Sequence, residues 1–316
     1  MGLQRGSAAT APRRASHRRP RCPKSIKYGS DFSGMDAAAV AMKRLTVDVT
    51  VEFASDTDAA CRKVLEAVHA PQIIYPDVMG VDVESKPPVD VYAWTPPCQD
   101  FSSAGKKKGA KGPRKTGSLM SKSLAYIKAK KPRVAIFENV VTLAQARFRP
   151  IFKGITKHLQ GSGYVVHSKV VNSRTCGLPQ DRRRLFIVAF LKDAQKHPFK
   201  WPKEHVAPSV STILDDRLPS DVAGRLPATK AGRDRCIRAF KECYQNNVDP
   251  RSTPVMVDID CGMNFFTYGV DECKTITRSR GGTGGPWVST HGRRLTTREL
   301  LKVWVVKATS IIVIAF

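Results

Sequence analysis

The chain has 316 residues and a formal net charge of +26, from 53 Lys plus Arg against 27 Asp plus Glu. This length allows one large domain with a smaller one and argues against a disulfide scaffold, and no apolar run reaches the roughly 18 residues that span a bilayer. The basic excess favours a polyanionic partner, although a solvated basic surface is an alternative explanation.

Cysteine spacing argues against a zinc ribbon, because no two cysteines form a Cys-x-x-Cys pair. We therefore expect reduced thiols and no bound metal. The eight cysteines are Cys22, Cys61, Cys98, Cys176, Cys236, Cys243, Cys261 and Cys273.

Residues 1–27 hold eight Lys or Arg, three Pro and no acid. A segment of this composition buries too little apolar surface to fold alone, so we expect a basic disordered tail. It suits a nuclear or nucleic-acid-binding arm, an organelle transit peptide, or a tail without function. We expect a nuclear location, with an organelle as the alternative.

From residue 26 onward, short apolar strands alternate with helical patterns, as in βα units. The last two strands have only a loop between them, which predicts an antiparallel addition at the sheet edge. The fold class expected is therefore α/β, a doubly wound and mostly parallel sheet. The strands expected are Ile26–Phe32, Val47–Phe53, Val89–Ala93, Arg133–Phe137, Tyr164–Val171 and Leu185–Leu191, and the helices are Asp36–Leu45, Asp58–Val68, Leu119–Lys130 and Phe148–Gln160.

Residues 193–290 are rich in Pro, Gly and Arg, with turn signals throughout and little periodicity. This texture predicts a second, smaller domain of irregular or short-stranded structure.

Two acidic or glycine-containing turns follow the first two expected strands, where a doubly wound sheet gathers its ligand site, and a further acidic residue lies between the second and third expected strands. Asp31-Phe-Ser-Gly-Met35 is a strand–helix turn whose helix N-terminus favours a carboxylate, such as that of a methionine moiety. In Asp56-Thr-Asp58 an acid can accept both ribose hydroxyls, and a helix N-cap is an equal alternative. Asp77-Val78 suits an adenine amino group or an ordinary surface loop.

The most specific motif is Thr95-Pro-Pro-Cys-Gln-Asp-Phe-Ser-Ser-Ala-Gly105. A buried strand delivers Cys98 into a loop that two prolines stiffen. Because the thiolate is the nucleophile, such a cysteine needs basic or helix-terminal neighbours. Lys106-Lys-Lys108 either help in this way or contact phosphate.

Two further motifs bring a carboxylate and arginines to the same edge of the expected sheet. Glu138 in Phe137-Glu-Asn-Val140 follows an apolar strand, where a carboxylate is either paired or functional. In Gln180-Asp-Arg-Arg-Arg184, Arg182 and Arg184 alternate onto one strand face, suited to a pyrimidine carbonyl or a phosphate, and Arg183 points away.

Taken in order, these blocks resemble the cytosine-C5 DNA methyltransferase family. The resemblance covers about residues 26–191 and resumes at His291-Gly-Arg-Arg-Leu-Thr-Thr-Arg-Glu299. It implies the S-adenosylmethionine-dependent methyltransferase fold, with a catalytic and cofactor-binding domain over 28–192, a target-recognition domain over 193–290 and a return segment over 291–316. DNA is the expected partner of a monomeric protein, and no membrane contact is expected.

The resemblance also implies the chemistry and its residues. Cys98 adds to C6 of a cytosine flipped out of the stack, Glu138 steadies N3 and the exocyclic amine, and Arg182 and Arg184 hold the O2 side. C5 then takes a methyl group from S-adenosylmethionine. The residues expected around that cofactor are Phe32, Ser33, Gly34, Met35, Asp56, Thr57, Asp77, Val78, Pro97 and Leu119.

Departures from the family pattern leave two alternatives open. Asp36-Ala-Ala follows the first glycine, Thr57 replaces an aromatic residue, and after Glu299 a Val/Ile-rich tail replaces the expected Gln-Gly-(Phe or Tyr)-Pro and Gly-Asn-(Ser or Ala) motifs. We therefore expect a C-terminally truncated chain, for which binding of nucleic acid without turnover is one alternative. A transfer-RNA methyltransferase is the other, since Cys261-Gly-Met-Asn-Phe-Phe-Thr267 loosely echoes the Cys-Phe-Thr signature of that branch.

Overall fold

The computed structural model describes residues 25–45, 48–98, 116–195, 197–217, 221–262, 265–282 and 284–305. The predictions made for residues 1–24, for Lys106-Lys-Lys108 and for the tail from residue 306 lie outside the described residues. None of the described helices is both long and apolar enough to cross a membrane.

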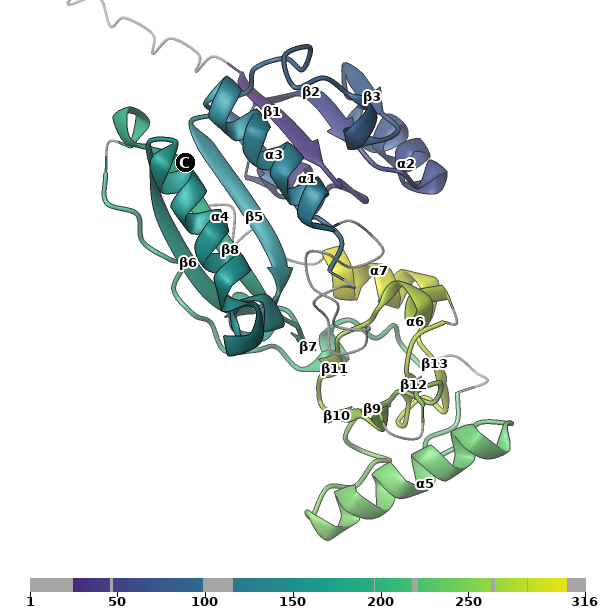
Figure 1. The fold of residues 1–316 in the computed structure, drawn as a ribbon. Coiled ribbons are helices and arrows are strands. Elements are labelled where there is room, and N and C mark those ends of the chain that lie inside the picture. Colours follow the sequence, from purple (N-terminus) through teal and green to yellow (C-terminus); the bar gives the residue numbers. More distant parts are fainter. Residues whose placement is uncertain are drawn as a thin grey trace, which may run out of the picture.

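A seven-stranded mixed sheet forms the larger unit, with strand order β3-β2-β1-β4-β5-β8-β6 (Figure 1). The first five of these strands in that order run parallel, and β8 pairs antiparallel with both β5 and β6. This confirms the doubly wound, mostly parallel sheet and the antiparallel edge. The strands are β1 (Ile26–Asp31), β2 (Val49–Ser55), β3 (Ile73–Tyr75), β4 (Val91–Trp94), β5 (Val134–Val140), β6 (Tyr164–Asn172) and β8 (Arg183–Leu191).

Helices cover both faces of this sheet because its central strands alternate apolar side chains between two cores. On β4, Tyr92 and Trp94 pack in the core under α3 and α4, whereas Val91 and Ala93 pack in the core under α1. Tyr92 and Trp94 are essentially fully buried. The helices of this unit are α1 (Ala37–Arg44), α2 (Ala59–His69), α3 (Thr116–Lys130) and α4 (Arg149–Gly161), and short 3-10 helices are η1 (Val78–Gly80), η3 (Val141–Ala144), η4 (Ala146–Phe148), η5 (Ser173–Cys176) and η6 (Lys192–Ala194).

A four-stranded antiparallel sheet, in the order β10-β9-β12-β13, organises the smaller unit. Successive residues of β9 point to opposite faces. Val255 and Val257 pack against α5, and Met256 packs in a cluster with α7. The elements are η7 (Val210–Thr212), α5 (Lys230–Gln245), β9 (Val255–Val257), β10 (Tyr268–Val270), α6 (Arg278–Gly282), β12 (Trp287–Val288), β13 (Arg293–Arg294) and α7 (Thr297–Val305).

The short strands agree with the expected texture of residues 193–290, but α5 was not predicted. It buries one side through Cys236, Ala239 and Cys243, and Thr229 caps its first turn. Residues 291–316 were assigned to a return toward the larger unit. The described part of that segment contributes β13 and α7 to the packing of the smaller sheet, and its role as a return segment stays a prediction.

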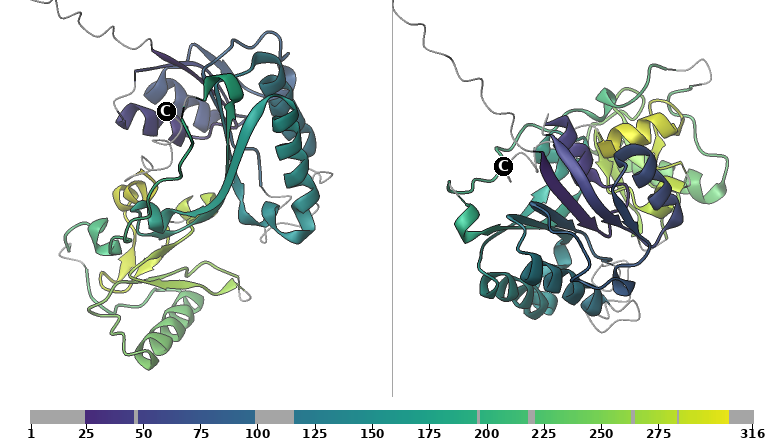
Figure 2. Two further views of the ribbon diagram at one scale, coloured as in Figure 1. Left: turned by 90° about the vertical axis from the view of Figure 1, so that its left-hand side faces the viewer. Right: turned by 90° about the horizontal axis from the view of Figure 1, so that it is seen from above.

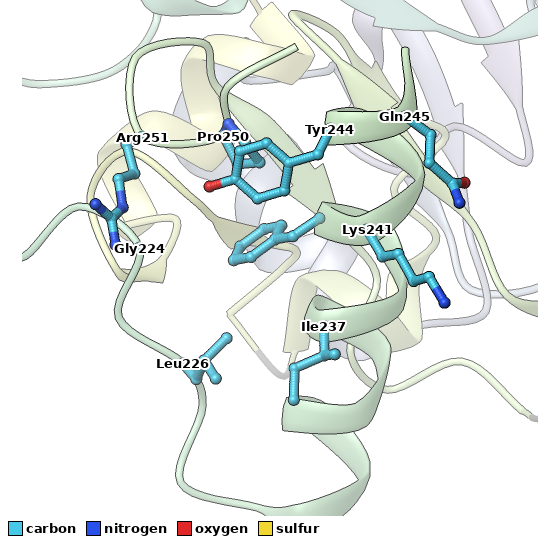
Figure 3. A pocket seen from close by; sticks show the side chains of 9 residues that line it. Gly224, Leu226, Ile237, Lys241, Tyr244, Gln245, Pro250 and Arg251 are labelled. Carbon is cyan, nitrogen blue, oxygen red and sulfur yellow. The ribbon is translucent and has the colours of Figure 1, made fainter. Parts of the chain in front are cut away.

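Figures 1 and 2 place α5 at the end of the molecule away from the large sheet. A cavity of about 610 Å³ lies along this helix (Figure 3). No residue of the chemical motifs lines it. Its lining residues are Gly224, Leu226, Ile237, Phe240, Lys241, Tyr244, Gln245, Pro250 and Arg251.

The two units are joined by a parallel pair of two-residue strands, β7 (Gln180–Asp181) and β11 (Cys273–Lys274). Strand β7 lies directly before β8 of the large sheet, and β11 belongs to the smaller unit. The junction therefore lies beside the arginine motif.

Candidate active site

The cysteine loop leaves the carboxyl end of β4 and is attached on both sides. Thr95 Oγ1 donates a hydrogen bond of 2.8 Å to the carbonyl of Phe32, the first residue after β1. On the other side Asn139 Nδ2, which is buried, donates one of 3.0 Å to the carbonyl of Pro96. Because proline also fixes φ in this loop, the backbone leading to Cys98 has little freedom. The motif is described as far as Cys98.

Glu138 lies on β5, next to the strand that delivers the cysteine. Strand β5 extends to Val140, beyond the predicted end at Phe137, so Glu138 projects from within a strand. Its neighbour Asn139 points to the opposite face of the sheet and holds the cysteine loop. In this motif Glu138 faces the site, and Asn139 supports the cysteine loop from the other face of the sheet.

The arginines reach Glu138 because β8 runs antiparallel to β5. The register places Arg184 opposite Val140 and Phe186 opposite Glu138. The Arg184 guanidinium lies 3.1 Å from the Glu138 carboxylate, and the Arg182 guanidinium lies 3.6 Å from it. Arg183 instead faces solvent, with its side chain 69% exposed. The structure therefore brings Glu138, Arg182 and Arg184 together and separates Arg183 from them.

Electrostatics around the thiol act in opposite directions. Burial raises the pKa of the Cys98 thiol above its ordinary value, the Arg184 guanidinium lowers it, and the Glu138 carboxylate raises it again. Arg182 also lowers the Cys98 pKa, and the net direction is upward. Burial, together with Arg182, lowers the pKa of the Arg184 guanidinium, which the Glu138 carboxylate opposes. The four groups form one coupled electrostatic cluster.

The turn after β1 has an uncommon backbone. Phe32 and Gly34 both adopt positive φ, 59° and 57°, and a bulky residue in that region is typical of strained functional turns. A Cβ at Gly34 would meet no atom within 4 Å, so the turn borders open space. Ser33 donates its N–H to the Ser55 carbonyl at 2.9 Å, and Met35 is exposed.

Helix α1 begins at Ala37, in agreement with the expected helix Asp36–Leu45. Asp36, at φ 52°, is its N-cap, and its buried carboxylate accepts the Ala39 N–H at 3.0 Å and the Tyr28 hydroxyl at 2.7 Å. A carboxylate of the chain itself therefore occupies part of the helix N-terminus for which a ligand carboxylate was expected.

The two acids after β2 have separate roles. Asp58 is the N-cap of α2 and accepts the N–H groups of Ala60 and Cys61. The Asp56 carboxylate accepts the N–H of Gly34 at 2.8 Å and that of Asp58 at 2.9 Å. Asp56 therefore borders the Phe32–Gly34 turn, and the N-cap role belongs to Asp58.

The remaining residues expected around the cofactor differ in exposure. Asp77 is exposed and accepts the N–H of Met79 at 2.9 Å as the cap of η1. Val78 is buried, Thr57 is exposed, and Pro97 and Leu119 are half-buried. A role of these five residues in cofactor binding stays a prediction.

A buried ion pair beneath this turn was not predicted. Asp31, at the end of β1, pairs with Lys86 at 2.6 and 2.8 Å and accepts hydroxyl hydrogen bonds from Tyr92 and Ser55. Asp31 and Lys86 are 1% and 3% exposed. Sequence gives no signal for Lys86, since it lies in an irregular segment far from Asp31 in the chain. Among the described residues, no group of three or more His, Cys, Asp or Glu is placed to hold a metal ion.

Known proteins match both the sequence and the fold. The chain is 32% identical to the type II methyltransferase M.NlaX of Neisseria lactamica over 58% of this chain and 58% of that relative, so it spans about three-fifths of the relative's length. It is 30% identical to the type II methyltransferase M.Bsp6I of Bacillus sp. over 87% of this chain and 85% of that one. A prophage-encoded E. coli protein described as a DNA modification methyltransferase shares the fold, with a TM-score of 0.61, 17% identity and 88% coverage of both chains.

The family model for C-5 cytosine-specific DNA methylases matches residues 26–308, which include every motif described above except the basic tail. This chain belongs to the C-5 cytosine-specific DNA methylase family.

Proposed function

We propose that this chain transfers a methyl group from S-adenosylmethionine to C5 of cytosine in DNA through a covalent adduct with Cys98. The observation that carries the proposal is the convergence of four motif residues at one sheet edge. Cys98 lies in an anchored loop, and its charge environment is set by Glu138, Arg184 and Arg182. A nucleophile, a carboxylate and two guanidinium groups together match the demands of addition to a pyrimidine ring.

Each group has a role in that addition. The Cys98 thiolate attacks C6, and the electron pair of the C5–C6 bond moves toward C5 and the N3–O2 side of the ring. Glu138 holds N3 and the exocyclic amine, and the Arg182 and Arg184 guanidinium groups stabilise charge at O2. C5 then takes the methyl group, and loss of the C5 proton with elimination of Cys98 restores the aromatic ring. The base must be flipped out, because neither ring face is reachable inside a duplex.

The residues present suit S-adenosylmethionine, which when bound supplies the methyl group. A carboxylate has about four acceptor positions, and Asp56 uses two of them for the Gly34 and Asp58 amides. Two positions remain for donors such as ribose hydroxyls. The open space at Gly34 and the half-buried Phe32 are consistent with a ligand over this turn.

The net charge of +26 supports a polyanionic substrate. Each Lys or Arg near a phosphate releases condensed counterions, which makes binding steeply dependent on salt. We favour DNA over transfer RNA on the motifs and on the family.

Transfer of a tritiated methyl group to duplex DNA and to transfer RNA, measured side by side, tests the proposal. The Cys98→Ser variant should lose transfer by at least about a thousandfold, because a serine hydroxyl is a far weaker nucleophile, with DNA affinity retained. Cys61→Ser, a change on α2 outside the cluster, is the matched control. Transfer that persists in Cys98→Ser would exclude the covalent mechanism, and transfer to RNA alone would exclude DNA as substrate.

S-adenosylhomocysteine binding, measured by titration calorimetry, separates this proposal from binding without turnover. Micromolar affinity together with measurable transfer supports the enzyme. DNA binding with neither would favour the binding-only alternative.

A further inference from the structure

Residues of the smaller unit hold the strand that carries the arginines. Thr275 Oγ1 donates a hydrogen bond of 3.0 Å to the carbonyl of Asp181, and Cys273 donates its N–H to the carbonyl of Pro179 at 2.8 Å. The next residue after Asp181 is Arg182. The junction between the units is therefore one peptide away from a residue of the candidate active site.

Lys274 links the two units by charge. Its ammonium group lies 3.2 Å from the Asp181 carboxylate and also pairs with Glu272. Glu272 is buried to 8% exposure and pairs in addition with Arg174 of η5. The Lys274 side chain, which is 37% exposed, thus lies between the Asp181 and Glu272 carboxylates.

Asp181 passes this constraint to the backbone of Arg182. Its carboxylate accepts a hydrogen bond of 2.9 Å from Asn172 Nδ2, and Asn172 Oδ1 in turn accepts the Arg182 N–H at 3.1 Å. The Arg182 carbonyl accepts the Ser173 N–H at 3.0 Å. Asn172, which contacts Asp181, thus binds the N–H of Arg182, and its chain neighbour Ser173 binds the Arg182 carbonyl.

The held backbone aims the arginine side chains. Arg182 and Arg184 are two residues apart on one face, and both guanidinium groups lie within 3.6 Å of Glu138. A rotation of the strand at Asp181 would move both groups relative to Glu138 and Cys98. A misplacement of about 1 Å in such a site can lower a rate about a hundredfold.

We propose that Lys274 is a positioning residue for the chemical step, acting through Asp181 and Asn172 on Arg182 and Arg184. The smaller unit then contributes to catalysis as well as to substrate recognition. This inference rests on the proposed function, because Lys274 can affect a chemical step only if Arg182 and Arg184 take part in methyl transfer.

Single-turnover methyl transfer at saturating DNA and S-adenosylmethionine tests it, with Lys274→Met and Lys274→Arg compared. Lys274→Met should lower the rate constant on the order of 10- to 100-fold, with the dissociation constant for DNA changed by less than about threefold. Lys274→Arg, which keeps the charge, should recover most of the rate. Lys169→Met is the control, because Lys169 on β6 makes an exposed pair with Glu204, remote from Asp181 and Lys274 in the network of contacts described above.

Hydrogen exchange gives a second readout that needs no activity. In Lys274→Met the amides of residues 172–184 should exchange faster, whereas those of β1 and β4 should be unchanged. Unaltered exchange in that segment, an unaltered rate constant, or equal losses of rate and DNA affinity would each overturn the proposal. If the unmodified protein transfers no methyl group, the proposed function fails, and the exchange experiment still decides whether Lys274 holds the arginine strand.

Discussion

Replacing Lys86 with Met should destabilise the protein far more than loss of an ordinary lysine. The Lys86 ammonium is 2.6 and 2.8 Å from the two Asp31 oxygens and lies over the rings of Phe53, Tyr75 and Tyr126. Burial lowers the pKa of Lys86, and the Asp31 carboxylate opposes this. Methionine has a similar length, so the variant leaves little cavity and mainly removes the charge.

The structure sets the size of the effect. Breaking a buried ion pair by removing one partner costs about 3–5 kcal/mol, because the other charge is left uncompensated. Asp31 would retain the hydroxyl hydrogen bonds from Tyr92 and Ser55, which favours the lower end, about 3 kcal/mol. Asp31→Asn should cost a similar amount, since it leaves the buried ammonium without a counter-charge.

Urea unfolding of the two single variants and of the double variant measures this coupling. The double variant removes both charges, so its loss should be smaller than the sum of the single losses by about 2–3 kcal/mol. Lys169→Met, which breaks the exposed pair with Glu204, should cost less than about 1 kcal/mol. Additive losses for Lys86 and Asp31, or a cost for Lys86→Met no larger than that of the control, would refute the reasoning.

Two further predictions concern titration. Because burial raises the pKa of Cys98, its alkylation by iodoacetamide should still accelerate above about pH 9. Site-resolved mass spectrometry measures this, and a plateau for Cys98 near neutrality would contradict it. Burial raises the pKa of Glu299, but hydrogen bonds from Arg293 and from the N–H groups of Thr296 and Asp215 outweigh it and leave that pKa lowered. The stability that Glu299 contributes is then complete above its unfolded pKa of about 4.3 and is lost as pH falls through the lower folded value. Urea midpoints between pH 7 and 3 should fall less steeply in Glu299→Gln than in the unmodified chain, and equal slopes would exclude this role.

Much of the large sheet could be predicted because its signals are local. Strand β4 is a continuous apolar run, as expected when both faces of a parallel strand are covered, and α4 and β6 follow each other with a glycine turn between them. The sequence pattern does not predict helix α5, because the fully buried side chains of this helix are small. Cys236, Ala239 and Cys243 give a weak apolar pattern among many charged positions, so helical spacing was present without strong hydrophobicity.

The catalytic motif residues of the site could be predicted because of their positions at the ends of strands. Each motif follows or opens a strand, and a sheet gathers such positions at one edge, so Glu138 and the arginines were expected near Cys98. The supporting contacts could not be predicted. Lys86 meets Asp31, and Lys274 meets Asp181, across long stretches of chain, and no local pattern specifies such pairs. The choice between Asp56 and Asp58 also needed the helix start, because either acid suits a cap by sequence.

The reversed direction of β8 is what makes the site possible. In a parallel sheet only the carboxyl ends of strands meet at the edge where Cys98 and Glu138 lie. Arg184 is the second residue of β8, so a parallel β8 would place it at the opposite edge, about the length of the strand away. The antiparallel pairing of β5 and β8 instead sets Arg184 opposite Val140, two residues from Glu138. It also turns the start of β8 toward the smaller unit, where β11 pairs with β7. One reversal therefore supplies both the arginines of the site and the strand through which Lys274 reaches them.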